Sequence, residues 1–279
     1  MRRNIYISTP LIVMLVLISV IIGVVSIIKI VSVRKTYDYA NEIYSDISDK
    51  YVTEIETNAD ALQEEEAPLK ASFIWDYESA HLQYPDIVGY IHQENTEYLS
   101  YPILQGQTND TYLRHLITGE YNIAGSIFVD SGYPFALDSN YCVVYGHNMK
   151  NHSMFGSLLC YRDPAYYKGH ETFDIYVRDR HYRYYVYAVC TSHINGDIFT
   201  YQFDSEETFI KLFEDIKSRS DFPAEDPLGP VTADDHFICL TTCTYDLDYD
   251  YRYTVVIRRG EEYADEKMPE LNQTDDRES

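Results

Sequence analysis

The sequence has no CxxC pair and no other spacing typical of a zinc site. Its five cysteines are Cys142, Cys160, Cys190, Cys239 and Cys243. Metal binding by these residues is therefore poorly supported, and we assign no metal ligands. Because the number is odd, at least one thiol stays unpaired within the chain, either as a reactive group or as a buried, inert one.

A calcium loop of the EF-hand type is also missing. Asp246, Asp248 and Asp250 have the spacing of the first ligands of such a loop. The sixth position, however, is Tyr251 instead of glycine, and the twelfth is Ile257 instead of glutamate. This pattern excludes an EF-hand and favours a solvated acidic hairpin, with a looser cation site as the open alternative.

Positive charge is scarce. The chain carries 22 basic against 45 acidic side chains, a formal net charge of -23. Such a chain repels phosphate backbones, so we predict no binding to nucleic acid. With 279 residues and 45% hydrophobic content, the sequence can supply a membrane segment and one well-buried domain.

One long apolar run is present near the N-terminus. Residues 11–28 contain no charge and are just long enough to cross a bilayer as a helix. Arg2 and Arg3 precede the run, and Lys29, Arg34 and Lys35 follow it. Because no small-residue cleavage site follows, we interpret residues 1–30 as an uncleaved signal anchor. Basic residues on both sides leave the orientation open by the positive-inside rule.

Residues 31–70 are acidic and carry apolar side chains every three or four positions, from Ile43 through Ile47 and Tyr51 to Leu62. This spacing predicts an amphipathic helical stalk. It serves either as a spacer or docking helix, or as a first helix packed on the domain. Sequence alone does not choose between them.

Residues 71–260 have the pattern of a strand-rich domain. The 29 tyrosines and their β-branched neighbours favour a barrel or sandwich. We predict strands at 126–129, 141–145, 173–177, 182–190, 237–241 and 253–257. One helix interrupts them, with Ser205 as N-cap and an apolar stripe of Phe209, Leu212, Phe213 and Ile216. The apolar-poor tail, 261–279, is predicted to be disordered.

Two predicted strands deliver a chemically reactive side chain just past their ends. His147 follows the strand 141–145, and Cys243 follows the strand 237–241. A rigid strand fixes where such a side chain emerges, as a nucleophile and its proton partner require. Arg252 opens the next strand, and a hairpin would bring its guanidinium beside the thiol. There it would favour thiolate and stabilise a developing oxyanion.

This order of residues resembles the class B sortases of Gram-positive bacteria. The likeness runs from about Phe73 to Arg258, through the segments 84–91, 101–106, 145–150, 153–156 and 217–220. The family's TLxTC motif reads CLTTC here, because Cys239 replaces its first threonine. We expect this departure to affect packing or redox sensitivity more than chemistry.

The resemblance implies a mainly β fold. It would be a closed sortase barrel of about eight strands, with N-terminal helices, a helix between late strands and one preceding transmembrane helix. By the same resemblance, Cys243 is the nucleophile, His147 the proton-transfer partner and Arg252 the cationic stabiliser. The implied groove residues are Asn109, Leu113, Tyr145 and Thr241.

The function implied is that of a membrane-anchored cysteine transpeptidase without metal or organic cofactor. Cys243 would cleave a sorting-signal peptide of a secreted surface protein, and a peptidoglycan precursor amine would take the acyl group. The N-terminus would be cytoplasmic and the catalytic domain extracellular. Two alternatives stay open: a membrane-anchored cysteine protease that gives the thioester to water, and a non-catalytic extracellular binding module.

Overall fold

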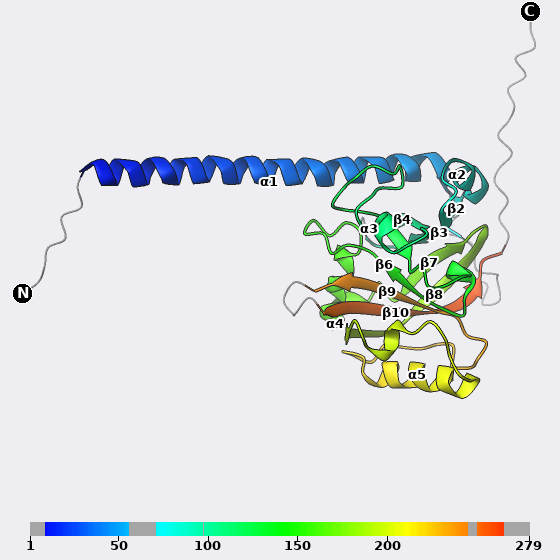
Figure 1. The fold of residues 1–279 in the computed structure, drawn as a ribbon. Coiled ribbons are helices and arrows are strands. Elements are labelled where there is room, and N and C mark those ends of the chain that lie inside the picture. The colour runs from blue at the N-terminus through cyan, green and yellow to red at the C-terminus, as the bar shows by residue number, and fades with distance from the viewer. Residues whose placement is uncertain (1–8, 56–70, 97, 245–249, 265–279) are drawn as a thin grey trace, which may run out of the picture.

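The computed structural model describes residues 9–55, 71–96, 98–244 and 250–264. A single helix, α1 (Thr9–Tyr51), leads into a domain built around eight strands. At 1.5 Å per residue this helix is about 65 Å long. Its N-terminal half projects away from the domain, and its C-terminal end lies across it (Figure 1).

The eight strands close into a barrel in the order β10-β8-β7-β3-β4-β5-β6-β9, which confirms the predicted fold class. The strands are β3 (Ile87–His92), β4 (Ser100–Leu104), β5 (Ile127–Val129), β6 (Tyr141–Tyr145), β7 (Thr172–Val177), β8 (Arg180–His193), β9 (Phe237–Cys243) and β10 (Tyr251–Glu262). The β4–β5 and β6–β9 pairs are parallel, and the other neighbours are antiparallel. Closure pairs both edges of every strand, so the sheet exposes no edge for association.

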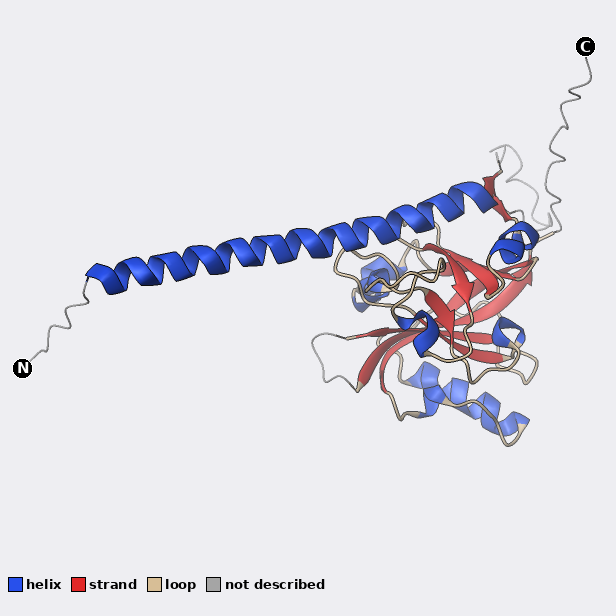
Figure 2. Ribbon diagram, turned by 45° about the horizontal axis from the view of Figure 1, so that its top comes forward, coloured by secondary structure: helices blue, strands red, loops and turns tan. Residues whose placement is uncertain are grey.

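Short helices fill the connections. They are α2 (Tyr77–Gln83), α3 (Asp110–Leu113), α4 (Pro164–Tyr167), and the 3-10 helices η2 (Ala136–Asp138), η3 (Gly156–Arg162) and η4 (Asp197–Phe199). The one longer helix of the domain, α5 (Glu206–Ser218), begins as predicted. The Ser205 side chain caps it, and Phe209, Leu212, Phe213 and Ile216 are buried against the barrel. Figure 2 shows α5 beneath the strands, on the side opposite α1.

The first half of α1 has the character of a membrane span. In the described part of the chain it is the one helix long and apolar enough to cross a bilayer by length and composition. Its apolar side chains from Ile12 to Val33 are exposed, and no described segment of the domain covers them. Because such a surface is costly in water, a membrane anchor or signal segment is the consistent interpretation.

The second half of α1 packs on the domain. Ala40, Tyr44, Ile47 and Tyr51 are buried, at the spacing of one helical face. The packed-helix alternative is therefore the one observed here. The helix is shorter than the predicted stalk, because β-branched residues follow and β1 (Val52–Glu54) pairs with β2 (Phe73–Trp75). The rest of that stalk, residues 56–70, lies outside the described residues.

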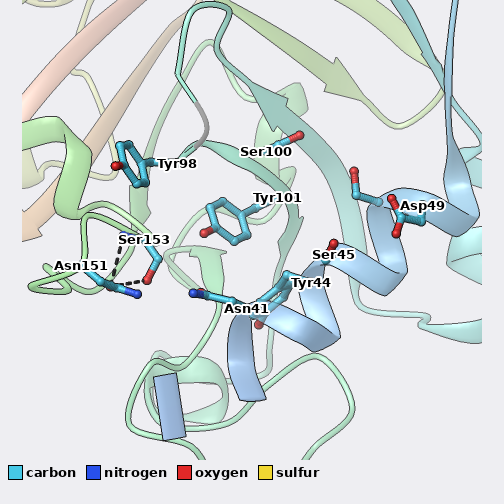
Figure 3. Close-up of a pocket in the computed structure, with 10 residues that line it drawn as sticks. Asn41, Tyr44, Ser45, Asp49, Tyr98, Ser100, Tyr101, Asn151 and Ser153 are labelled. Atoms are coloured by element: carbon cyan, nitrogen blue, oxygen red, sulfur yellow. Dashed lines mark hydrogen bonds between the residues drawn. The ribbon is translucent and has the colours of Figure 1, made fainter. Parts of the chain in front are cut away.

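A neighbouring polar stripe of α1 lines a cavity of about 360 Å³. Asn41, Ser45 and Asp49 form its helical side, and Tyr101 and the segment 151–153 lie across from them (Figure 3). The hydroxyl of Tyr101 accepts a hydrogen bond from the Met154 amide at 3.2 Å. The second half of α1 therefore docks next to the segment that follows β6.

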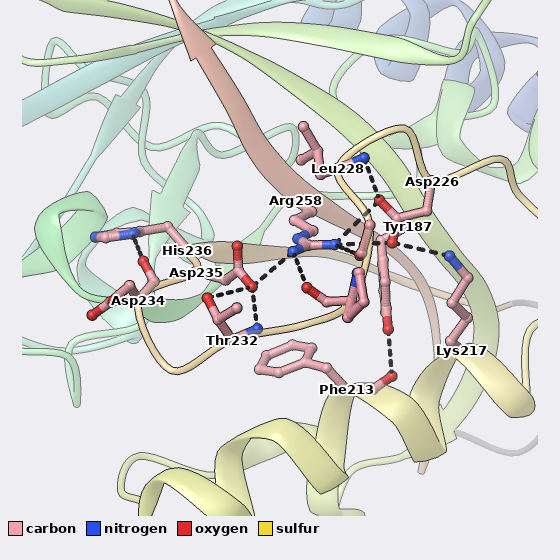
Figure 4. A network of polar contacts seen from close by, with 12 residues as sticks. Tyr187, Phe213, Lys217, Asp226, Leu228, Thr232, Asp234, Asp235, His236 and Arg258 are labelled. Carbon is pink, nitrogen blue, oxygen red and sulfur yellow. Dashed lines mark hydrogen bonds and ion pairs between the residues drawn. The ribbon is translucent and has the colours of Figure 1, made fainter.

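A buried cation fixes the chain as it enters β9. Arg258 of β10 is 2% exposed and donates to Asp226 at 3.0 Å and to Asp235 at 2.8 Å. It also donates to the carbonyl oxygens of Gly229 and Pro230 (Figure 4). These contacts hold the connection from α5 to β9 against the barrel. The position of β9, and of the cysteine at its end, depends on this connection.

The C-terminal boundary lies later than predicted. β10 continues past Gly260 to Glu262, and the Tyr263 ring is buried, stacked on His181 at 3.9 Å between centroids. Its hydroxyl donates to Asp174, which accounts for the extension of order beyond residue 260. The predicted disordered tail, from 265 onward, lies outside the described residues.

Candidate active site

A cavity of about 430 Å³ opens where β6 and β9 end and β10 begins. All seven residues predicted from the sequence line it: Asn109, Leu113, Tyr145, His147, Thr241, Cys243 and Arg252. They come from segments up to 143 positions apart, between Asn109 and Arg252. Barrel closure brings these distant segments to one place.

Cys243 and Arg252 meet through the β9–β10 ladder. Cys243 is the last residue of β9, and it pairs directly with Arg252 near the start of β10. Directly opposed residues of an antiparallel pair project from the same face of the sheet, with their Cβ atoms about 4.5–5.5 Å apart. Both side chains are half-buried. The ladder therefore starts both side chains from the same face of the sheet, and Arg252 Nη1 donates to the Tyr251 carbonyl oxygen at 3.0 Å.

His147 reaches the same place because β6 runs parallel to β9. Tyr145 pairs with Thr241, and the next residue, Gly146, donates its amide to the Thr241 carbonyl at 3.2 Å. The carboxyl ends of parallel neighbours emerge at one edge of a sheet, so the residues that follow them lie together. The Thr242 hydroxyl donates to the Gly146 carbonyl at 2.8 Å, which ties the two ends further.

Glycine is required at 146 for this close approach. A Cβ atom there would lie 2.5 Å from a methyl carbon of Ile127 and 2.6 Å from the Phe155 ring. On the far side of His147, the Asn148 amide donates to the Cys243 carbonyl at 2.9 Å. The histidine is thus held between two residues that each contact the end of β9.

The imidazole of His147 has one identified partner. Its Nε2 donates to the carbonyl oxygen of Leu113 at 2.6 Å. Burial lowers the pKa of His147, the hydrogen bond to Leu113 opposes this change, and the nearby charge of Arg114 lowers the pKa further. At neutral pH the ring is therefore mainly neutral, and Nδ1 is the nitrogen left to exchange a proton.

The other four thiols lie in environments that disfavour thiolate. Burial raises the pKa of Cys142, Cys160, Cys190 and Cys239, that of Cys239 to about 12. Cys239 is fully buried, with its sulfur 3.4 Å from the Thr241 hydroxyl. The cysteine that departs from the sortase motif is thus a core residue of β9.

The four predicted groove residues differ in what they offer a ligand. Leu113 is 38% exposed and presents an apolar surface. The Asn109 side chain accepts from the Ser131 amide at 2.7 Å, and Thr241 is 1% exposed. These two residues shape the wall more than they face the cavity. Tyr145 is half-buried, and its hydroxyl donates to Asp130.

Sequence reasoning missed part of the cavity wall. The missed residues include Phe128, Asp130, Ile194, Phe199 and Tyr201. Asp130 could have been found from the sequence, because it comes directly after the predicted strand 126–129. His147 and Cys243 were found in the same way, each two residues after a predicted strand. The last three belong to the irregular connection between β8 and α5, where no periodic pattern indicates which side chains point inward. In the described parts of the chain, no group of three or more His, Cys, Asp or Glu residues is arranged to hold a metal ion.

Comparison with known proteins points in one direction. No family model matches the chain. It is 33% identical over 166 residues to the sortase B of Listeria monocytogenes; the match covers 59% of this chain but only 65% of that relative. It is 26% identical over 167 residues to the sortase B of Staphylococcus aureus, covering 60% of this chain and 67% of the relative.

Solved structures agree with these relatives. Sortase B from Bacillus anthracis superposes with a TM-score of 0.64 at 25% identity, over 81% of this chain and 98% of that one. A Staphylococcus aureus sortase B–substrate complex gives a TM-score of 0.59 at 25% identity, over 67% and 85%. With the barrel topology and the strand-end residues already described, these similarities lead to one conclusion. The chain resembles sortase B proteins in both sequence and fold.

Proposed function

We propose that this protein is a membrane-anchored cysteine transpeptidase. The observation that carries the proposal is the convergence of Cys243, His147 and Arg252 on one cavity, with Cys243 and Arg252 directly paired across two strands. A sulfur nucleophile, a proton carrier and a permanent cation are the groups that acyl transfer through a thioester needs.

In the first step, neutral His147 takes the proton of the Cys243 thiol, and the resulting thiolate attacks the carbonyl carbon of a peptide bond in a sorting signal. The electron pair of the carbonyl moves to oxygen, and the Arg252 guanidinium stabilises that negative charge. Protonated His147 then gives a proton to the departing amine as the C–N bond breaks. An acyl thioester remains on Cys243, and His147 is neutral.

In the second step, a primary amine attacks the thioester carbonyl. Neutral His147 takes the proton from that amine, the new amide bond forms, and Cys243 leaves as thiolate. One related sortase B structure is a complex with triglycine and another is a substrate complex, which supports a peptide donor and a glycine-type amine acceptor. The acceptor would belong to a peptidoglycan precursor.

The apolar half of α1 supports the placement of this activity at a membrane. We place the N-terminus in the cytoplasm and the catalytic domain outside, where secreted surface proteins and wall precursors meet. Figure 1 shows that the N-terminal end of β10 points to the side from which α1 projects. The cavity would then face the membrane surface.

The test is mass spectrometry of the full chain in detergent, incubated with candidate sorting peptides. An acyl adduct on Cys243, absent in Cys243→Ala, identifies the nucleophile and the cleavage point. Adding triglycine should convert the adduct to a ligated peptide. Hydrolysis alone at saturating triglycine would support a protease instead. Failure of a thiol probe to label Cys243 faster than the four other cysteines would support a non-catalytic module.

A further inference from the structure

A buried carboxylate lies in the wall of the active-site cavity. Asp130 directly follows β5 and is only 2% exposed. Its Oδ1 accepts from the Gly132 amide at 2.8 Å. Its Oδ2 accepts from two tyrosine hydroxyls, Tyr145 at 3.0 Å and Tyr201 at 3.1 Å. All three partners are donors, so the site is built for an acceptor-only carboxylate.

The two tyrosines belong to different parts of the cavity wall. Tyr145 ends β6, two residues before His147, and its position is set by the barrel. Tyr201 lies in the connection between β8 and α5, which also gives Ile194 and Phe199 to the cavity. Tyr201 is 53% exposed, so burial alone does not fix its ring.

The backbone beside Asp130 is shaped to receive the Tyr201 ring. A Cβ atom at Gly132 would lie 2.2 Å from that ring, so only glycine leaves room for it. The Tyr133 ring packs against Tyr201 at 5.1 Å between centroids. One carboxylate oxygen thus joins the fixed wall to the irregular connection at a defined spacing.

We propose that Asp130 is a positioning residue that sets the width of the substrate cleft by holding Tyr145 and Tyr201 on a single carboxylate oxygen. It acts through these two tyrosines on a bound peptide, and not on the bond that breaks. This role rests on the proposed transpeptidase function for the identity of the ligand. The carboxylate brace itself is a property of the fold.

The inference is tested with Tyr201→Phe, Tyr145→Phe, Asp130→Ala and Asp130→Asn in the full chain. The matched control is Tyr187→Phe, which also loses a buried tyrosine hydrogen bond, to the Phe213 carbonyl at 3.1 Å, but lies outside the cavity. Hydrogen bonds to a charged group are strong enough that we expect Tyr201→Phe to raise KM for the sorting peptide about tenfold. Its kcat should change less than KM does.

A double-mutant cycle separates a brace from general damage. In the Asp130→Ala variant the acceptor is absent, so adding Tyr201→Phe should cause no further rise in KM. Asp130→Asn keeps one acceptor oxygen, so its KM should lie between those of the parent and Asp130→Ala. The proposal would be overturned if the increases in KM were additive, if KM did not change, or if the increase were equal to that of the Tyr187→Phe control.

A second measurement does not depend on catalysis. Hydrogen–deuterium exchange of peptides covering 194–201 should be faster in Tyr201→Phe and Asp130→Ala than in the parent and the control. If these peptides exchanged at the parent's rate in both variants, Asp130 would not position the 194–201 segment, whatever the activity of the variants. Absence of a Cys243 adduct in the parent would instead count against the proposed function, and the exchange result would still decide the role of Asp130.

Discussion

Arg252 lies directly opposite Cys243 in the β9–β10 ladder. The register leaves no freedom to move one strand end without the other, because seven consecutive pairs continue the ladder from Arg252–Cys243 to Arg258–Phe237. The backbone that carries the cation is therefore positioned by the sheet itself. Electrostatic stabilisation is strongest when the charge is placed before the reaction begins.

Substitution of Arg252 tests this placement. We expect Arg252→Ala to slow adduct formation on Cys243 by about 10²–10³-fold, the loss typical of one oxyanion-stabilising group. Arg252→Lys should recover only part of the rate, since an ammonium lacks the planar fork of guanidinium. Single-turnover mass spectrometry measures the rate. Arg178→Ala, which breaks an exposed pair with Asp138, is the control and should behave as the parent. Equal rates in all three variants would remove Arg252 from the mechanism.

The pH dependence should report His147. Burial lowers its pKa, so the acid limb of kcat/KM should lie below the ordinary value of about 6.5. The charge of Arg114 contributes to this lowering. Arg114→Gln should therefore move the acid limb to higher pH, while Arg178→Gln should not move it. The limb is measured from initial rates of peptide cleavage across pH 4–8. A shift in the opposite direction would contradict the assignment.

Loss of the buried cation should destabilise the fold. Removal of one partner from a buried ion pair typically costs about 3–5 kcal/mol, because the other charge is left uncompensated. We expect Arg258→Ala to lower the free energy of unfolding by that amount, since Asp226 and Asp235 lose their shared partner. Breaking the exposed Arg178–Asp138 pair should cost about 0–1 kcal/mol. Chemical unfolding of the full chain in detergent gives both values. Similar losses of unfolding free energy in the two variants would contradict the difference expected between a buried and an exposed ion pair.

A buried histidine should make stability depend on pH. His181 is stacked between Tyr176 and Tyr263, and burial lowers its pKa to about 3. Its contribution to stability is present above pH 6.5 and is lost as the pH falls toward 3. Burial also raises the pKa of Asp174 to about 6, an opposite contribution that is present below pH 3.8 and lost as the pH rises through 6.

These two contributions are separated by His181→Phe. The free energy of unfolding of this variant, relative to the parent, should rise as the pH falls from 6.5 to 3, by at most about 1.4 kcal/mol per pH unit. Asp174→Asn should show the reverse trend between pH 3.8 and 6. Unfolding curves at several pH values provide the measurement. A constant difference between His181→Phe and the parent across this range would rule out a neutral buried imidazole.

Truncations should separate the two halves of α1. Deletion of residues 1–30 should move the protein from the membrane to the soluble fraction and leave its thermal unfolding nearly unchanged. Deletion of residues 1–51 should destabilise the domain, because Tyr44, Ile47 and Tyr51 each bury a side chain worth about 1.5–3 kcal/mol. Membrane fractionation and thermal unfolding check both. If the protein without residues 1–30 stayed in the membrane fraction, the membrane anchor could not be confined to the apolar half of α1.

How far the sequence predicts this protein depends on the kind of pattern available. The strands at 141–145 and 237–241 and the helix after Ser205 were predicted because alternation, apolar stripes and caps are local signals. The barrel strands β3 and β4 were not predicted from periodicity. β4 contains Pro102, which weakens a strand pattern.

The end of the stalk and the cavity wall were less accessible to prediction. An amphipathic period does not tell where a helix yields to a strand, as happens at Val52, because that choice depends on pairing with Phe73–Trp75. Similarly, the place of Tyr201 depends on Asp130, 71 positions earlier. Contacts between irregular segments leave no period in the sequence.

The uninterrupted course of α1 from its apolar half to Tyr51 has one further consequence. Each residue of an α-helix advances by 1.5 Å and turns by about 100°. Adding or removing a single residue between 29 and 39 would therefore swing the whole barrel around the helix axis by roughly a quarter turn or more. The length of this short stretch therefore sets the direction, around the helix axis, in which the cavity opens relative to the apolar half of α1.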